Sequence, residues 1–174
     1  MKKLAIVLFL VFTGSLQAQT IFEAARAGNT AELETLLKAN KEVLNSADNK
    51  GFTPLILASY NNHVETVVYL LKKGASVNEK DLSGNNALMG VCFKGYFEIA
   101  KLLIDNGANL DQQNYNNATA LIYASTFGHA DIVDYLLKKG ANKDIKDSRG
   151  NTALKHAIMQ ENEDVMKLLS IKSL

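Results

Sequence analysis

Apolar runs, small turn residues and charged positions recur along this chain with a period of 33 residues. Four turn residues mark the register at this spacing: Gly51, Gly84, Asn117 and Gly150. Two residues after each of them, a Thr or Asn opens a short run of small and apolar side chains. Periods of this length predict a solenoid, because one unit cannot cover its own apolar face and neighbouring units must stack to close the core.

Each period begins with a predicted short helix. Its N-cap residues are of types whose side-chain oxygens accept a backbone hydrogen bond, namely Thr53, Asn86, Thr119 and Thr152. Pro54 takes the first helical position in one period, where its missing N–H costs nothing. We expect this helix to cover residues 54–61.

A second helix is expected after residues 62, 95, 128 and 161. Its first turn carries an acidic residue, which the helix dipole favours: Glu65, Glu98, Asp131 or Asp164. Left-handed glycines are expected to end it at Gly74, Gly107 and Gly140. The buried stripe follows i, i+3, i+4 spacing and comprises Val67, Leu70 and Leu71, then Ala100, Leu103 and Ile104, then Val133, Leu136 and Leu137.

These residues resemble the ankyrin repeat. The family pattern is present as Gly51, Thr53-Pro54-Leu55, Ala58, Asn62-His63, Val67 to Leu71 and Gly74-Ala75. An earlier copy, beginning at Ala24 and containing Leu36-Leu37, is similar to an N-terminal capping repeat. The resemblance covers residues 21–174 and implies an all-α solenoid of helix-turn-helix units with short β-turn or hairpin-like connections, with about four to five repeats including caps. Their expected bounds are 20–48, 49–81, 82–114, 115–147 and 148–174.

The chain departs from the family pattern at several positions. The His that follows Thr-Pro-Leu in the family is replaced by Ile56, Met89, Ile122 and Lys155. The hydrogen bonds of that His to neighbouring turns are therefore left open. The last repeat has Ser170 where the others place Leu or Ile, as expected of a terminal helix whose outer side meets water.

Residues 1–18 read as an export signal that precedes a domain of residues 19–174. Lys2 and Lys3 come before nine apolar residues, 4–12, and cleavage is expected after Ala18. Nine residues are too few to cross a bilayer, for which about 20 are needed. The alternative is an uncleaved anchor or a buried helix. We expect a periplasmic or secreted protein without membrane insertion after signal removal.

Charge and motif content narrow the function classes. Without Lys2 and Lys3, 17 basic residues face 18 acidic ones, and this balance argues against a nucleic-acid partner. Metal-ligand spacings and phosphate-cradling glycine loops are missing from the sequence, so we expect no cofactor and no metal site. His63 and His129 occupy matching repeat positions, where the family uses them structurally. An enzyme acting through scattered carboxylates and His156 is the least favoured class.

Cys92 is the only cysteine, so an internal disulfide is excluded. The equivalent positions in neighbouring repeats hold Ser59 and Ser125, which favours a small buried residue. The alternative is a redox-responsive thiol, which requires an exposed sulfur of low pKa.

The resemblance implies that the turn tips and the exposed side of the first helix line one concave face that binds partners. The tip candidates are Asn49, Lys50, Phe52, Leu82, Ser83, Asn85, Tyr115, Asn116 and Arg149. The first-helix candidates are Tyr60, Asn61, Phe93, Lys94 and Phe127, with Met159 in the matching position of the last repeat. Five of these residues are aromatic, and aromatic side chains edged by Lys, Arg and Asn are typical of a protein-binding patch. Burial of some rings between adjacent repeats is the alternative.

The sequence therefore predicts an exported, non-catalytic and monomeric module that binds another protein through its concave face. The alternative within the same fold is an inhibitor or immunity-type protein that blocks a secreted or periplasmic enzyme.

Overall fold

The computed structural model describes residues 21–170, which form two compact units divided between Ser76 and Val77. We call them the N-terminal unit (21–76) and the C-terminal unit (77–170). Within the described residues the secondary structure consists of helices and turns, without strands. The predicted all-α class is confirmed, whereas the predicted export signal, residues 1–18, lies outside the described part of the chain.

The N-terminal unit holds the first capping repeat and the next repeat. Residues 21–27 are helical, followed by α2 (Thr30–Ala39), the 3-10 helix η1 (Lys41–Asn45), α3 (Pro54–Tyr60) and α4 (Val64–Lys72). The α2 helix packs against η1 and α4, and α3 packs against η1 and α4. The η1 turn lies where this first copy is longer than the repeat period, so it takes up the additional length of chain.

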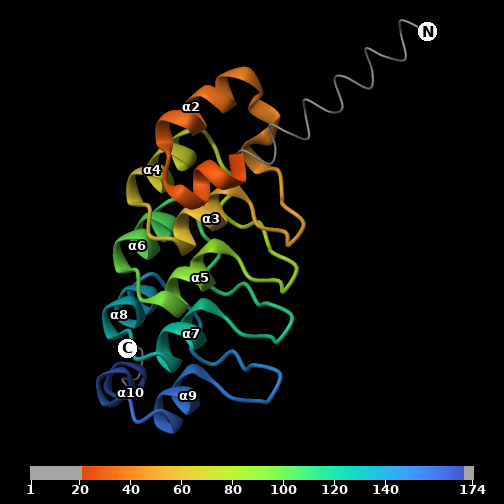
Figure 1. The fold of residues 1–174 in the computed structure, drawn as a ribbon. Helices are drawn as coiled ribbons and strands as arrows, with labels where there is room; N and C mark the ends of the chain where they lie inside the picture. The colour runs from red at the N-terminus through yellow and green to blue at the C-terminus, as the bar shows by residue number, and fades with distance from the viewer. Residues whose placement is uncertain (1–20, 171–174) are drawn as a thin grey trace, which may run out of the picture. The chain divides into compact units, whose positions relative to one another are not determined.

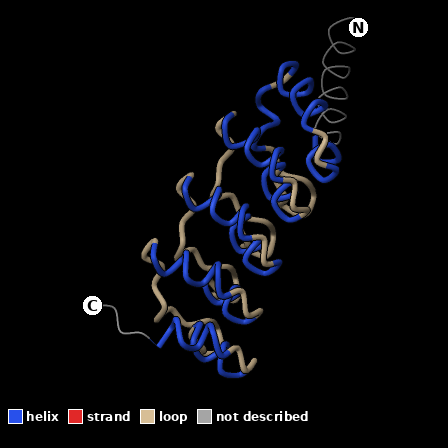
Figure 2. Tube along the Cα trace, turned by 90° about the vertical axis from the view of Figure 1, so that its left-hand side faces the viewer, coloured by secondary structure: helices blue, strands red, loops and turns tan. Residues whose placement is uncertain are grey.

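The C-terminal unit holds three layers, each a pair of helices with a turn. The first helices are α5 (Ala87–Lys94), α7 (Ala120–Thr126) and α9 (Ala153–Met159), and the second helices are α6 (Phe97–Asp105), α8 (Ala130–Lys138) and α10 (Glu163–Ser170). First helices pack against first helices, and second against second. Figure 1 shows that the turns and the second helices of this unit lie on opposite sides of its first helices. Figure 2 shows each helix pair and its turn as one layer.

The helix starts form as predicted. The Thr53 hydroxyl accepts a hydrogen bond from the N–H of Ile56 at 3.3 Å, and the Asn86 amide oxygen accepts one from Met89 at 2.9 Å. The other first helices use the predicted caps at Thr119 and Thr152 in the same way. These bonds satisfy backbone N–H groups that have no partner inside a helix.

The helix ends also follow the prediction, with positive φ angles at Gly74, Gly107 and Gly140, and Asn117 has a positive φ in the turn before α7. Gly95 is constrained in addition by packing. A Cβ atom on this residue would lie 2.5 Å from the His129 ring, which is closer than any side chain can approach. The ring reaches over Gly95, and His129 Nε2 donates to the carbonyl oxygen of Phe93 at 3.4 Å.

This bond between repeats recurs, which confirms the structural role predicted for His63 and His129. His63 Nε2 donates to the carbonyl oxygen of Arg26 at 2.9 Å. In the last repeat Asn162 replaces the His, and its amide donates to the carbonyl oxygens of Ser125 and Thr126.

In each unit the core consists of apolar side chains that pack between its first and second helices. Most of the predicted stripe is buried, but Leu71 and Leu137 are half-exposed. The prediction omitted one fully buried position on each second helix: Thr66, Ile99, Ile132 and Val165. A second helix contacts both the first helix of its own repeat and the neighbouring second helix, so its buried face is wider than a single stripe.

Each turn is held by an acidic or amide residue of its own. Its Oδ1 atom accepts hydrogen bonds from two N–H groups, two and four residues later, at Asp48, Asp81, Asn114 and Asp147. Asp and Asn favour such turns because their short side chains reach their own backbone.

Among the described residues, every helix is too short or too polar to cross a bilayer.

Candidate protein-binding surface

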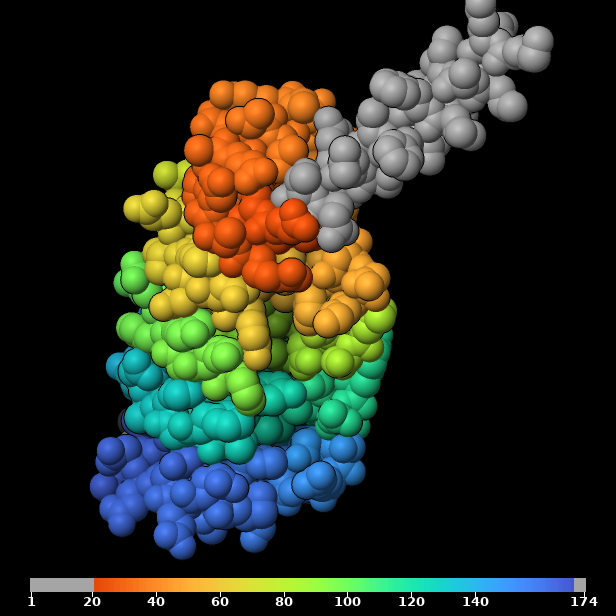
Figure 3. Space-filling view, in the orientation of Figure 1, coloured from red at the N-terminus to blue at the C-terminus, as the bar shows by residue number. Residues whose placement is uncertain are grey.

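The predicted partner-binding residues are almost all accessible to solvent. Phe52 and Asn85 are half-buried, and every other predicted residue is exposed. In the C-terminal unit the first helices lie between the turns and the second helices. Figure 3 shows the surface that the side chains form on this side of the unit. We call the exposed side of α5, α7 and α9, together with the turn tips of this unit, the first-helix face.

An aromatic pair lies on the first-helix face. Phe93, near the end of α5, and Phe127, just after α7, pack edge to face with their ring centroids 4.6 Å apart. Phe93 also contacts the Tyr123 ring at 6.3 Å, and Phe127 stacks on His129 at 6.5 Å. Even so, Phe93 remains 38% exposed and Phe127 47% exposed. The rings therefore bridge adjacent repeats and still present apolar surface to solvent.

The last repeat extends the apolar surface. Met159, at the end of α9, is 47% exposed and Ile158 is 44% exposed. Ile158 was not among the predicted residues because its repeat position is not one that the family uses for binding. The same repeat position is buried at Cys92 and Ser125, so only the structure shows that Ile158 is exposed.

The turn tips add two large apolar side chains. Leu82 is 70% exposed and Tyr115 72% exposed. The backbone beneath them is joined from tip to tip, because the N–H of Tyr115 donates to Ser83 and the N–H of Ser148 donates to Asn116. A Cβ on Gly84 would lie 2.9 Å from the Tyr115 nitrogen, so these tips meet too closely for any other residue there. The side chains are thus presented on a fixed backbone.

Asn85 lies in a bonding network rather than at an open tip. Its amide oxygen accepts a hydrogen bond from Asn114 at 2.7 Å, and Asn114 donates also to the Tyr123 hydroxyl at 3.0 Å. Asn85 therefore joins the turn before α5 to the turn before α7 and leaves little of its side chain for a partner.

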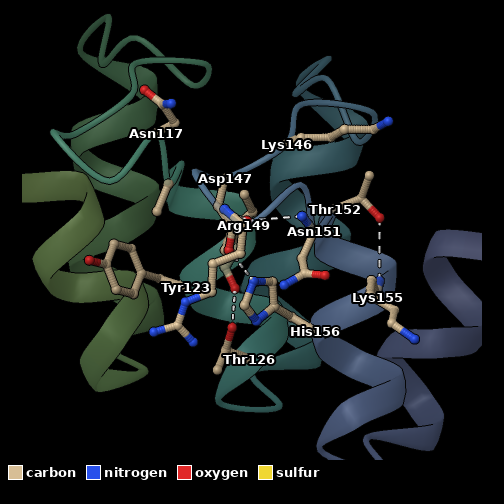
Figure 4. Close-up of polar contacts among 12 residues, drawn as sticks. Asn117, Tyr123, Thr126, Lys146, Asp147, Arg149, Asn151, Thr152, Lys155 and His156 are labelled. Atoms are coloured by element: carbon tan, nitrogen blue, oxygen red, sulfur yellow. Dashed lines mark hydrogen bonds and ion pairs between the residues drawn. The ribbon is translucent and has the colours of Figure 1, made fainter.

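His156 forms a similar contact in the last repeat, which the sequence analysis missed. Its Nε2 lies 2.8 Å from Asp147 Oδ2, and both side chains are mostly buried (Figure 4). Partial burial raises the pKa of Asp147, but hydrogen bonds from Asn151, His156 and Arg149 outweigh it and hold that pKa below its ordinary value. The nine-residue spacing matches that of Asn114 and Tyr123, and this shared spacing was the available signal. His156 thus stabilises the turn that contains Asp147.

The N-terminal unit presents one candidate ring to solvent. Tyr60 at the end of α3 is 43% exposed, whereas Phe52 is half-buried at its turn. The side-chain amide of Asn61 donates to the Leu57 carbonyl at 2.8 Å, so it caps α3. Asn49 and Lys50 are exposed at the same turn.

Cys92 is completely buried, which confirms the interpretation as a small core residue. Burial raises the pKa of its thiol far above the usual range. A thiol that solvent cannot reach and that stays protonated cannot serve as the redox-responsive group that was the alternative.

Comparison with known proteins gives one family. A family model described as "Ankyrin repeats (3 copies)" matches residues 3–81 and 88–173. The protein "Ankyrin repeat domain-containing protein 29" of Danio rerio is 41% identical over 61 residues, which are 35% of this chain and 20% of that protein.

Two further relatives have different names. "Alpha-latrocrustotoxin-Lt1a" of Latrodectus tredecimguttatus is 38% identical over 58 residues, 33% of this chain and 4% of the toxin. "DNA-binding protein RFXANK" of Homo sapiens is 38% identical over 61 residues, 35% of this chain and 24% of that protein. The matches with all three relatives cover less than a quarter of each relative's length.

Proposed function

Because the chain belongs to the ankyrin-repeat family, whose repeats bind other proteins, we propose that it docks a partner protein on the first-helix face and performs no catalysis itself. The observation that carries this proposal is the exposed pair of rings, Phe93 and Phe127, on a fixed scaffold. Desolvated aromatic side chains supply a large part of the binding energy at protein interfaces. Leu82 and Tyr115 at the turn tips and Met159 at the end of α9 are further exposed apolar side chains of this unit.

The rings also contribute to packing between repeats, so the test needs a matched control. Phe97, on α6, is 36% exposed and packs edge to face on Tyr135 at 5.8 Å. It resembles Phe93 in exposure and contact but belongs to a second helix. Phe97→Ala therefore reproduces the loss of an exposed ring on the opposite side of the unit.

The experiment captures partners from the native host with the full chain and repeats the capture with the variants. Phe93→Ala combined with Phe127→Ala is expected to abolish capture of a specific protein, while Phe97→Ala retains it and both variants melt near the wild type. Equal capture by wild type and the double variant contradicts the proposal. A captured hydrolase whose activity falls when the chain is added would establish the inhibitor form of the function.

We also propose that the protein is exported to the periplasm or the exterior. The support is the order of basic, apolar and small residues within residues 1–18. The native protein is expected in the exported fraction with its N-terminus near residue 19, as measured by mass spectrometry. A cytosolic protein that retains residues 1–18 would contradict export.

A further inference from the structure

The chain contains a single Asn-Gly pair, and it lies where α6 ends. Asn106 and Gly107 are both exposed to solvent. The equivalent turns after α4 and α8 have Lys73 and Lys139 before their glycines. Asparagine is among the chemically labile residues of proteins, and a following glycine has no side chain to shield its backbone nitrogen. Asn106 is therefore open to a chemical modification that the equivalent lysines cannot undergo.

The modification is deamidation, for which water is the only co-reactant. The backbone nitrogen of Gly107 loses its proton and attacks Cγ of Asn106, the side-chain nitrogen leaves as ammonia, and a succinimide ring forms. Water then adds to one of the two ring carbonyl carbons and breaks its bond to the ring nitrogen. The product at position 106 is aspartate or isoaspartate, and in isoaspartate the main chain runs through the side-chain carboxyl carbon.

The folded backbone holds the reacting atoms of this pair apart. Asn106 has a φ of −100° and a ψ of 20°. At this ψ the Gly107 nitrogen lies nearly opposite the Asn106 Cβ across the Cα–C bond, whereas ring closure requires both on the same side. The side chain of Asn106 is also held, because its Nδ2 donates to the carbonyl oxygen of Leu102 at 2.8 Å. Closure therefore requires rotation about ψ and loss of this hydrogen bond.

Hydrogen bonds on both sides of the pair maintain this conformation. The N–H of Gly107, which is the attacking group, donates to the carbonyl oxygen of Ile104 at 3.1 Å, and the N–H of Ala108 also donates back to α6. Asn78, from the preceding connection, holds the other side. Its Nδ2 donates to the carbonyl oxygen of Gly107 at 3.2 Å, and its Oδ1 accepts from the N–H of Asn109 at 2.8 Å. The turn must open before the backbone can rotate.

Either product of deamidation is incompatible with the folded turn. Aspartate has no side-chain N–H to donate to Leu102, and its charge lies at a helix C-terminus, where the helix dipole disfavours an anion. Isoaspartate adds a methylene group to the main chain before Gly107 and thereby displaces the N–H groups that donate to α6. The released ammonia does not recombine, so the change is permanent and the opened turn cannot regain its original bonds.

We propose that Asn106 is a conditional deamidation site, which the folded turn after α6 protects and which opening of that turn exposes to permanent conversion. Local opening is a normal property of folded proteins, and its free energy sets the fraction of time that a segment spends open. The rate of conversion at Asn106 is then the rate in the opened turn multiplied by this fraction. The inference is independent of docking on the first-helix face.

The test follows conversion at position 106 of the full chain by peptide mapping with mass spectrometry, at one pH and temperature, in buffer and in urea. The folded wild type is expected to convert roughly tenfold or more slowly than the unfolded chain. Asn78→Ala is expected to convert several-fold faster than the wild type in buffer. The matched control Asn45→Ala removes the equivalent hydrogen bond to Ser76 in the N-terminal unit and should leave the rate unchanged. In urea all three chains should convert equally fast.

A second measurement concerns the product. The converted chain, separated by ion exchange, is expected to show faster hydrogen exchange at the amides of Gly107 and Ala108 than the unconverted chain. Asn106→Lys, which installs the residue of the equivalent turns, should keep this protection and show no conversion.

Equal conversion rates of the wild type in buffer and in urea would overturn the proposal, and this comparison needs no variant, so it decides even where Asn78→Ala fails to fold. A folded Asn78→Ala that converts no faster than the wild type would also overturn it, as would unchanged hydrogen exchange in the converted chain.

Discussion

Cys92, Ser59 and Ser125 occupy the same position in three successive repeats, and all three are completely buried. The hydroxyls of Ser59 and Ser125 have no hydrogen-bond partner within the described residues. A buried hydroxyl without a partner loses its bonds to water and gains none in exchange, whereas a thiol loses much less. A thiol therefore suits this buried repeat position better than a hydroxyl does.

We therefore expect Ser125→Ala to increase the free energy of unfolding by about 1 kcal/mol, because it removes an unsatisfied hydroxyl and Ala is the better helix former. Denaturant unfolding followed by circular dichroism measures the change. Ser148→Ala, at an exposed turn position, is the control and should leave stability near the wild type. A clear loss of stability in Ser125→Ala would mean that the hydroxyl is bonded after all.

At the scale of single elements, the second helices owe their stability to their buried stripe. Leu103 on α6 is completely buried, while its neighbour Leu102 is half-exposed. Leu103→Ala should cost about 2 to 5 kcal/mol by opening a cavity between repeats. Leu102→Ala on the same helix is expected to cost clearly less, since part of its side chain already meets water. Comparable losses in the two variants, measured by the same denaturant titration, would show that the stripe is assigned incorrectly.

The turns are elements of their own, and the last one depends on a charge. Asp147 accepts two turn N–H bonds and contacts His156, and its pKa lies below 3.8, its ordinary value. A depressed pKa means that the carboxylate stabilises the fold above the unfolded pKa and that this stabilisation is lost as pH falls through the folded pKa.

We expect the stability difference between wild type and Asp147→Asn to be constant above about pH 5 and to shrink as pH falls below 4. The Asn variant keeps an oxygen that can hold the turn, as Asn114 does in the preceding repeat. Urea unfolding across this pH range measures the difference. Glu79→Gln, at an exposed position of the same unit, provides the comparison for a general loss of one charge. A difference that stays the same down to pH 2 would refute the role of the Asp147 charge.

At the scale of the whole molecule, stability is expected to add up from neighbouring repeats rather than from one centre. In the C-terminal unit, α9 packs on α7 and α10 packs on both α8 and α9. Ending the chain at residue 147 would uncover the apolar sides of α7 and α8. We expect this truncation to lower the denaturation midpoint and to promote association, as measured by urea titration and light scattering. Met159→Ser, which changes only an exposed side chain of the same repeat, should leave both measurements unchanged.

Many features of the structure follow from interactions between residues that are close together in the sequence. The caps at Thr53 and Asn86, the left-handed positions at Gly74 and Asn117, and the periodic stripe around Leu103 depend on neighbours a few residues away. The exposure of Phe93 and Phe127 also follows from their repeat positions, because the packing of the repeat does not require an apolar side chain at either position.

The contacts made across repeats were decided only by the tertiary structure. The buried position of Ile99 on α6, the Asn85, Asn114 and Tyr123 network and the pairing of His156 with Asp147 depend on side chains that meet only after the layers stack. The sequence by itself determined the repeat and its helices, since these obey local hydrogen bonding and period. Packing between layers decided which polar groups are satisfied inside and which side chains stay exposed.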